Sequence, residues 1–230
     1  AFGDDPFSKG QIAFFADHGI GIADSPIIPG ARPGLYAITL TGAERSFTYW
    51  RSDAAARQLA SDPSALAKSL QNRDLVYFSG ITLAILDPAA RKILVAAISR
   101  ARENGARIAF DPNYRPRLWP DVASAKAAIT GALATVDIAL PTFPDEQALF
   151  GDATPADTVT RLTAAGIAEI VVKNGEAPAL VAHAGNSAES PAIHVETPVD
   201  TTGAGDSFNG AYLAARLAGN TPADAARRAH

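Results

Sequence analysis

Two glycines and a carboxylate stand directly before a helical pattern near the end of the sequence. Gly203-Ala204-Gly205-Asp206 precedes apolar residues at helical spacing. Glycines let the backbone approach an anion closely, and the unsatisfied first-turn amides of a helix point at it. A carboxylate beside a phosphate is electrostatically costly unless it accepts a proton, so Asp206 is a candidate general base. The alternative is an ordinary first-turn acid that stabilises the helix dipole.

Two arginines follow an apolar segment in the middle of the chain. Asp111-Pro112-Asn113 forms a predicted turn after this segment, and Arg115 and Arg117 come next. Ligands of parallel sheets lie beyond the carboxyl ends of the strands, and guanidinium groups bind carboxylates through two hydrogen bonds. The pattern therefore favours an acidic ligand. The alternative is that these arginines pair with Asp121 or with neighbouring acids in a solvated loop.

Longer strings around these residues resemble a known family. Residues 200–219, DTTGAGDSFNGAYLAARLAG, resemble the C-terminal signature of the ribokinase-like (PfkB) carbohydrate kinases. DPNYRPRLW, PGLYAIT and FTYWR look like the 2-keto-3-deoxygluconate kinase branch of that family. The resemblance implies an enzyme that uses ATP and Mg²⁺ to phosphorylate a small sugar acid, 2-keto-3-deoxygluconate, to its 6-phosphate.

The resemblance also implies roles for particular residues. Asp206 would take the proton from the sugar hydroxyl, while Gly203, Ala204 and Gly205 would form an anion hole for the transferred phosphoryl group. By matching position, four residues would contact the sugar acid: Tyr36, Tyr49, Arg51 and Arg115.

The metal-binding motif departs from the family pattern. Relatives commonly carry Asn-x-x-Glu near the metal, whereas this chain has Thr142-Phe143-Pro144-Asp145, with Glu146 adjacent. Asp145 would then be the metal-linked acid. An ordinary helix start at this point explains the same residues.

The nucleotide loop departs from the pattern as well. Lys173-Asn174-Gly175 matches the first half of the family's Lys-x-Gly-x-x-Gly loop, but Pro178 replaces the second glycine. Asn-Gly is also a common hairpin turn. The residues expected to contact the nucleotide are Lys173, Gly175, Thr202, Gly203 and Gly205.

Periodicity predicts the elements that must position these residues. A helix is expected at about 7–18, a hairpin of strands at 34–40 and 45–51, and a βαβαβ run over 75–142. A helix at about 155–165, a strand pair at 168–175 and 178–185, and a helix after Gly203 complete the chain. This alternation predicts an α/β fold with a mostly parallel sheet covered on both faces.

The family resemblance adds detail to this fold. It implies one ribokinase-like, three-layer α/β/α domain over residues 1–230, apparently lacking the family's N-terminal strand region and C-terminal helices. The hairpin at about 34–51 would belong to a small β-sheet lid. That lid would cover the sugar or pair with the lid of a second copy in a homo-oligomer.

Composition excludes several kinds of function. The chain has 230 residues, 47% of them hydrophobic, a formal net charge of −4 and no cysteine. It therefore has no basic field for nucleic acid or anionic lipid, no disulfide framework and no thiol nucleophile. No apolar run approaches the roughly 20 residues of a membrane-spanning helix. A cytoplasmic protein that binds a small molecule is expected.

Three other functions fit parts of the pattern. A kinase for a neutral sugar, such as ribose or fructose, would share the glycine turn and Asp206. A non-catalytic domain that senses a nucleotide or metabolite would keep the glycine turn but need neither Asp206 nor Mg²⁺. A Rossmann dehydrogenase is disfavoured because the turn lies near the C-terminus and lacks G-x-G-x-x-G spacing.

Overall fold

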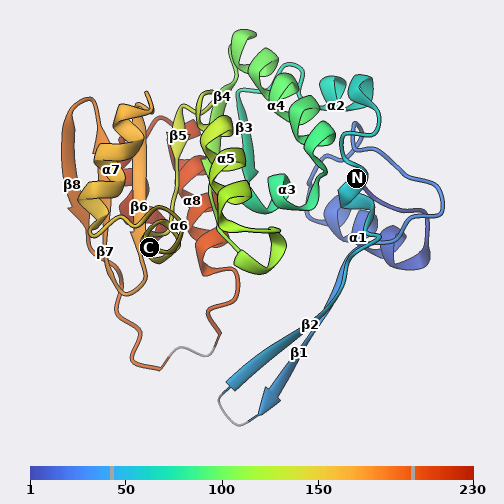
Figure 1. Ribbon diagram of the computed structural model, residues 1–230, viewed down its shortest axis with the longest axis horizontal. Coiled ribbons are helices and arrows are strands. Elements are labelled where there is room, and N and C mark those ends of the chain that lie inside the picture. Colours follow the sequence, from blue (N-terminus) through green and yellow to red (C-terminus); the bar gives the residue numbers. More distant parts are fainter. Residues whose placement is uncertain (42–43, 198–199) are drawn as a thin grey trace. The chain divides into compact units, whose positions relative to one another are not determined.

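The chain folds into two compact units. The computed structural model describes residues 1–41, 44–197 and 200–230 (Figure 1). One unit, called unit 1 below, comprises Ala1–Arg73 and Ile85–Asn104. The other, unit 2, comprises Asp74–Ala84 and Gly105–His230.

Unit 1 contains helices and a long two-stranded hairpin. Its helices are α1 (Pro6–Asp17), α2 (Pro63–Ser69) and α4 (Pro88–Glu103), and a short 3₁₀ helix spans Ala55–Gln58. Each of the three α-helices begins with proline after an aspartate whose carboxylate accepts first-turn N–H groups. Strands β1 (Leu35–Thr41) and β2 (Glu44–Trp50) pair antiparallel. The predicted hairpin is confirmed, and its residues 42–43 lie outside the described part of the chain.

Unit 2 is built on a six-stranded sheet. The strands are β3 (Leu75–Ser79), β4 (Arg107–Asp111), β5 (Ile138–Ala139), β6 (Glu169–Asn174), β7 (Ala177–His183) and β8 (Asn186–Ser190), adjacent in that order. Strands β3 to β6 are parallel, while β7 and β8 pair antiparallel. The carboxyl ends of β3, β4, β5 and β6 therefore meet along one edge of the sheet.

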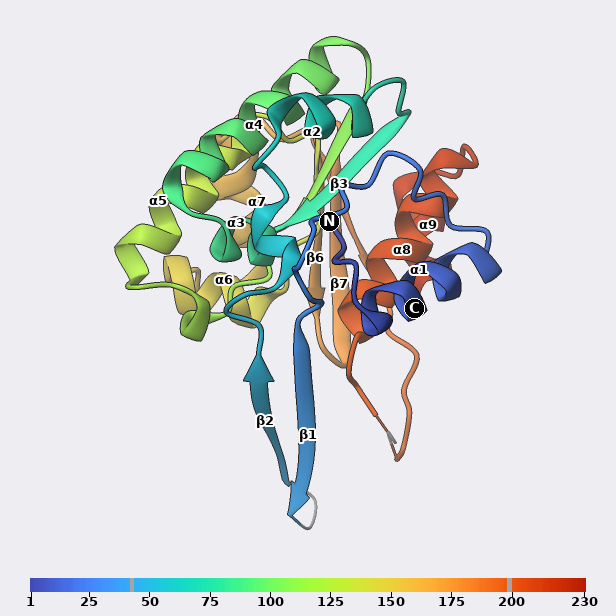
Figure 2. The ribbon, with the colours of Figure 1, turned by 90° about the vertical axis from the view of Figure 1, so that its right-hand side faces the viewer.

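Helices cover both faces of this sheet. On one face lie α8 (Ala204–Leu217) and α9 (Pro222–Ala229), and on the other lie α5 (Val122–Leu133), α6 (Phe143–Phe150) and α7 (Pro155–Ala164) (Figure 2). Phe208 and Tyr212 of α8 pack in a buried cluster with Ile138 and Val171 of the sheet and with Leu140, which directly follows β5. The predicted α/β fold is confirmed: three layers, a mostly parallel sheet and a small antiparallel sheet.

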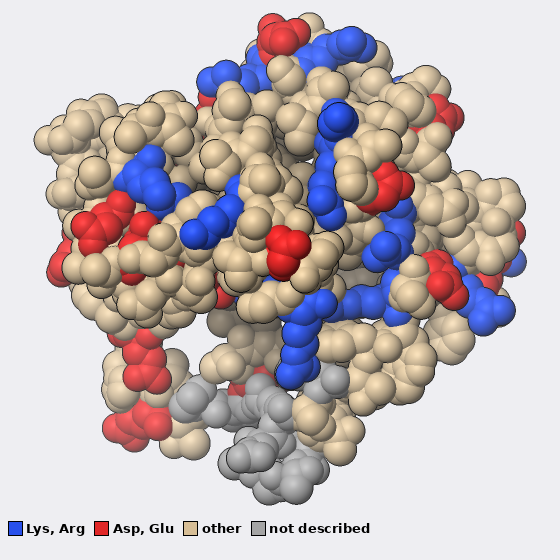
Figure 3. Space-filling view, in the orientation of Figure 1, with Lys and Arg blue, Asp and Glu red and all other residues tan. Residues whose placement is uncertain are grey.

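Several elements were not predicted from periodicity. These are α2, α9, β8 and the short helix α3 (Gly80–Ile85), which follows β3 directly. None of the described helices is both long and apolar enough to cross a lipid bilayer. On the face drawn in Figure 3, acidic and basic side chains are interspersed rather than segregated.

Candidate active site

The glycine turn forms the N-terminus of α8. Gly203 has φ +76°, a left-handed conformation that favours glycine, and it is the N-cap residue. The amide of Ala204 donates to the Thr201 carbonyl (3.2 Å), and that of Ser207 donates to the Gly203 carbonyl (2.8 Å). Because the first amides of a helix have no partner within it, those of Gly205 and Asp206 remain available for an anion. Asp206 is solvent-exposed in this first turn.

The segment that enters the turn is also ordered by a carboxylate. The Thr202 amide donates to Asp200 Oδ1 (2.8 Å), which closes an Asx turn just before Gly203. Thr202 itself is exposed. This residue, predicted to contact the nucleotide, therefore lies beside the anion-binding turn.

Four side chains meet beneath the glycine turn. Lys173 Nζ donates to Asp111 Oδ2 (2.7 Å) and to Asn209 Oδ1 (2.9 Å). Asn209 Nδ2 donates to the same Asp111 oxygen (2.7 Å) and to the Tyr77 hydroxyl (3.1 Å). Lys173, Asp111 and Asn209 are buried, and a Cβ built on Gly205 would lie 3.7 Å from Lys173 Nζ. We call these four residues the buried polar cluster.

The charges around Tyr77 show that Asp206 lies near this cluster. Burial, together with the negative charges of Asp111 and Asp206, raises the pKa of the Tyr77 hydroxyl to about 12, against the opposing effect of the bond from Asn209. Tyr77 therefore stays protonated at neutral pH. Its hydroxyl both accepts from Asn209 and keeps a proton to donate.

Arg115 and Asp145 form an ion pair at the same edge of the sheet. Arg115 lies in the loop after β4, and its Nη1 is 3.1 Å from Asp145 Oδ2 in the first turn of α6. Burial raises the pKa of the Asp145 carboxyl, and the Arg115 charge opposes this effect. The charges of Asp111 and Lys173 also act on Asp145. The structure therefore brings the predicted metal ligand next to a predicted substrate ligand and beside the buried polar cluster.

The side-chain donors at this edge of the sheet suit a metal ion that takes only one or two protein ligands. Among the described residues, no group of three or more His, Cys, Asp or Glu side chains could hold a metal ion. Mg²⁺ usually keeps several waters and binds through one or two carboxylates and substrate phosphates. The half-buried carboxylate of Asp145 fits that mode, and a closed protein cage does not fit.

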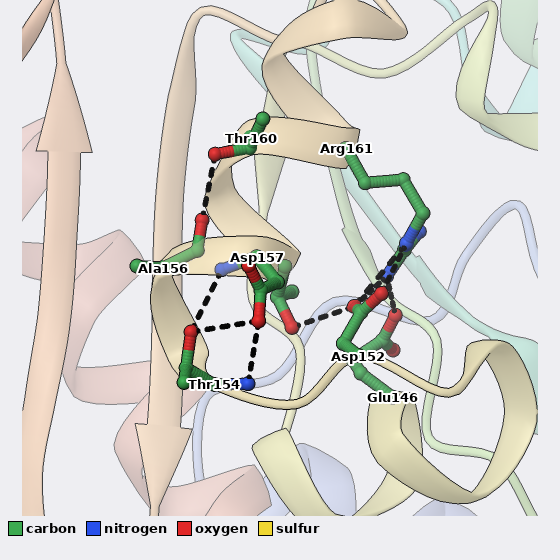
Figure 4. Close-up of polar contacts among 8 residues, drawn as sticks. Glu146, Asp152, Thr154, Ala156, Asp157, Thr160 and Arg161 are labelled. Carbon is green, nitrogen blue, oxygen red and sulfur yellow. Dashed lines mark hydrogen bonds and ion pairs between the residues drawn. The ribbon is translucent and has the colours of Figure 1, made fainter.

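Glu146, next to Asp145, serves a different purpose (Figure 4). It is fully buried, and its Oε2 accepts a 2.6 Å bond from Arg161, which also binds Asp152 at 2.6 Å. Asp152 in turn accepts from the Thr158 hydroxyl (2.7 Å). These bonds join α6 to α7. Glu146 therefore anchors α6 rather than presenting its carboxylate to a ligand.

Three predicted substrate residues meet on the hairpin of unit 1. Tyr36 lies opposite Tyr49 across the strand pair, with ring centroids 6.2 Å apart. The Arg51 guanidinium lies 4.1 Å above the centre of the Tyr49 ring, a cation–π contact. Tyr49 also lines a cavity of about 560 Å³ in unit 1, together with Arg32 and Trp50. The fourth predicted substrate residue, Arg115, belongs to unit 2.

The remaining predicted nucleotide residues lie at the end of β6. Gly175 has φ +61° and is exposed in the turn between β6 and β7, which confirms the turn predicted at Asn174-Gly175. Lys173, two residues earlier, is buried. Its amide donates to the Pro141 carbonyl (2.8 Å), which ties the end of β6 to the start of α6.

Sequence reasoning missed two members of the buried polar cluster and misjudged a third. Asp111 was interpreted as a turn residue only, while Tyr77 and Asn209 were not singled out. Asn209 could have been found because it lies three residues after Asp206, on the same face of the helix. Tyr77 carried no comparable signal, because it is one aromatic residue among several in an apolar strand.

Comparisons with known proteins agree with one another. The family model described as "pfkB family carbohydrate kinase" matches residues 1–230 of this chain. The 2-dehydro-3-deoxygluconokinase of Dickeya dadantii is 41% identical over 100% of this chain and 76% of its own length. Fructokinase-1 of Zea mays is 31% identical over 92% of this chain and 65% of its own length.

A solved structure gives the same result for the fold. A putative ribokinase II from E. coli, 26% identical, covers 99% of this chain and 72% of the solved chain. The TM-score is 0.88 for its apo form and 0.86 for its complex with ATP and Mg²⁺.

Proposed function

This chain belongs to the pfkB family of carbohydrate kinases, and from that membership we propose that it transfers the γ-phosphoryl group of ATP to 2-keto-3-deoxygluconate, forming the 6-phosphate. The observation that carries the proposal is the exposed Asp206 carboxylate in the first turn of α8, directly after the left-handed Gly203. A base and an anion-binding turn within three residues are what attack by an alcohol on a phosphate requires.

Asp206 would act as the general base. Its carboxylate would accept the proton of the 6-hydroxyl as the oxygen of that hydroxyl attacks the γ-phosphorus and the bond to the β-phosphate oxygen breaks. A general base of this kind contributes about 10² to 10⁴ in rate. The amides of Gly205 and Asp206, which have no partner within the helix, would stabilise the charge that gathers on the transferred phosphoryl group. The Ala204 amide, expected to belong to this anion hole, already donates to the Thr201 carbonyl.

The nucleotide would lie along the same turn. Thr202, Gly203, Gly205 and Gly175 are exposed or partly exposed and can approach its phosphates, and Lys173 adds a positive charge beside Gly205. When bound, Mg²⁺ would neutralise negative charge on the phosphates. Asp145 would hold that ion, and its half-buried carboxylate, which already pairs with a cation, supports this role.

The acid end of the sugar would bind arginines. Arg51 and Arg115 carry the forked donors that bind carboxylates through two bonds, and Tyr36 and Tyr49 would contact the sugar from the hairpin. The contact of Arg51 with the Tyr49 ring supports the hairpin residues acting as a group. Arg115 is half-exposed and so accessible to a ligand, although its present partner is Asp145.

The test is ADP release in the presence of ATP, Mg²⁺ and a panel of sugars and sugar acids. We expect turnover with 2-keto-3-deoxygluconate and a loss of at least about 10² in kcat in Asp206→Asn. Asp224→Asn is the matched control, because Asp224 is a first-turn acid of α9 in the same unit. If Asp206 only stabilises its helix, both variants will lose a little stability and neither will lose turnover.

A kinase for a neutral sugar is the second candidate, favoured by the 31% identity to a fructokinase. It predicts that fructose or ribose turns over at least as well as the sugar acid. A sensing domain predicts nucleotide binding without ADP release from any member of the panel. ADP release therefore separates the two kinases, and a measurement of nucleotide binding by an inactive parent identifies the sensor.

The site of action and the oligomeric state belong to this proposal too. ATP and sugar acids meet in the cytoplasm, where we place the enzyme. The hairpin exposes several apolar side chains that a second hairpin could cover in a homo-oligomer: Leu35, Tyr36, Ile38, Tyr49 and Trp50. Light scattering on Trp50→Asp and on the parent protein tests this assembly, because a monomeric parent would contradict it.

A further inference from the structure

Asn209 lies one helical turn after Asp206. Residues three apart project from the same face of a helix, so the direction of the Asn209 side chain is tied to that of Asp206. Asn209 is 1% exposed, whereas Asp206 is open to solvent. The same helix face therefore carries a fixed residue in its second turn and the proposed base in its first.

Side chains from three strands of the sheet form hydrogen bonds with Asn209. Its partners come from the end of β4 (Asp111), the end of β6 (Lys173) and the middle of β3 (Tyr77), at sequence separations of 98, 36 and 132 residues. Bonds to three strands that lie side by side or close together fix both the rotation of α8 about its axis and its height above the sheet. A single hydrogen bond would leave one of these motions free.

The polarity of the Asn209 amide matches its surroundings atom by atom. Oδ1 accepts from the Lys173 ammonium, and Nδ2 donates to the Asp111 carboxylate and the Tyr77 hydroxyl. An aspartate here would set one carboxylate against another, and a leucine would fill the volume while making none of the bonds. Because Lys173 and Asp111 also pair directly at 2.7 Å, the ion pair itself does not need Asn209. The amide serves to attach α8 to that pair.

We propose that Asn209 is a positioning residue, which fixes the first turn of α8 on the Lys173–Asp111 pair so that the Asp206 carboxylate is held at the position of the reacting hydroxyl. This inference rests on the proposed kinase function. Lys173, whose Nζ lies against Gly205, adds its positive charge to the anion-binding turn from beneath. Asn209 touches no reactant and acts through Asp206.

The test is steady-state kinetics of Asn209→Leu. We expect kcat to fall about 10- to 100-fold, because a displacement of about 1 Å at a reacting group can cost that much. The KM values for ATP and for the sugar acid should stay within about twofold, since no ground-state contact is removed. If Asn209 served folding alone, the melting temperature would fall, but kcat would not fall selectively while the KM values stayed constant.

Tyr212→Phe is the matched control. Tyr212 lies on the same helix, three residues after Asn209, is equally buried and donates a 2.6 Å bond to Glu169 at the start of β6. This variant also loses a buried hydrogen bond between α8 and the sheet, so its melting temperature should fall as well. Its kcat should stay within about twofold of the parent value.

Two results would overturn the proposal. One is an unchanged kcat in folded Asn209→Leu; the other is a rise in the KM for ATP at constant kcat, which would place Asn209 or Lys173 in nucleotide binding instead. If Asn209→Leu shows no cooperative melting, Asn209→Ser replaces it under the same criteria. A parent protein that turns over no sugar refutes the kinase function itself, whereas an active parent with an unaffected variant refutes only the role of Asn209.

Discussion

Adjacent acids can differ in function because a helix points them in different directions. Asp145 and Glu146 both stand in the first turn of α6, where acids favour the helix dipole. Asp145 faces Arg115 and the edge of the sheet, while Glu146 is buried against Arg161. Only Oε2 of Glu146 is bonded, and its Oε1 is buried with no partner among the described residues. Burial of that unsatisfied oxygen disfavours the ionised form.

The titration of Glu146 predicts how stability changes with pH. Burial raises the pKa of its carboxyl to about 7, although Arg161 opposes the effect. Between pH 4.5 and about 7 the folded chain therefore holds a proton that the unfolded chain has lost, and its free energy of unfolding falls as the pH rises. Glu146→Gln cannot ionise. In urea denaturation, the advantage of the parent over this variant should shrink from pH 5 to pH 8.

Asp152 provides a control of opposite sign. Burial alone would raise the pKa of its carboxyl, but bonds from Arg161 and Thr158 outweigh burial and hold it below the ordinary value of 3.8. Its contribution is complete above that value and is lost only as the pH falls through the lower, folded-state pKa. The difference between the parent and Asp152→Asn should therefore change little from pH 5 to pH 8, and only because the Asp152 charge is a minor contributor to the raised pKa of Glu146. A parent advantage over Glu146→Gln that shows no change over this pH range would contradict the raised pKa of Glu146.

At the scale of elements, the sequence predicts the buried apolar strands and misses the polar elements that form only by pairing or packing with a neighbour. The parallel strands are short apolar runs between amphipathic helices, so alternation predicted β3, β4 and β5. Strand β6 was predicted as one member of a pair with β7. Strand β8 (NSAES) is mostly exposed and polar, and it exists because β7 offers it an edge to pair with. Helix α9 (PADAARRA) is too polar to be predicted from apolar periodicity, although it buries Ala225 and Ala226. Neither carries a local apolar signal.

Two glycines at the ends of elements should respond differently to a methyl group. A Cβ on Gly80, where β3 meets α3, would lie 1.9 Å from the Pro112 carbonyl oxygen, a backbone atom that cannot rotate away. Gly80→Ala should therefore cost about 3 kcal/mol or more in the free energy of unfolding. Gly203→Ala meets no atom within 4 Å but keeps φ +76°, which costs only about 1–2 kcal/mol.

Urea denaturation of both variants measures this difference, and Gly131→Ala serves as the reference. Gly131 lies inside α5 with nothing within 4 Å of its added Cβ, so alanine there should stabilise the protein by about 0.5–1 kcal/mol. Equal costs at Gly80 and Gly203 would mean that Pro112 can move, and with it the neighbouring Asp111 of the buried polar cluster.

For the molecule as a whole, the sequence predicts the edge at which the site lies but not its contacts. The rule that ligands lie beyond the carboxyl ends of parallel strands already placed Arg115 there, and the family resemblance added Lys173 at the end of β6. Which side chains meet depends on strand order, and residues 62 positions apart, such as Lys173 and Asp111, become partners only once that order exists. Lys173 was predicted to contact a nucleotide, and local sequence carried no sign of its buried bonds.

Binding by the whole molecule should be separable from its chemistry. A ligand that binds only the folded state stabilises it by about 2.7 kcal/mol at 100 times its Kd. For a chain of this size, each kcal/mol raises Tm by about 2–4 °C, so ATP with Mg²⁺ should raise Tm by about 5–10 °C. Asp206→Asn should keep this rise while losing turnover, because the anion-binding amides belong to the backbone. A lost rise in this variant would show that Asp206 supports nucleotide binding itself, and a rise in an inactive parent would point to a sensor.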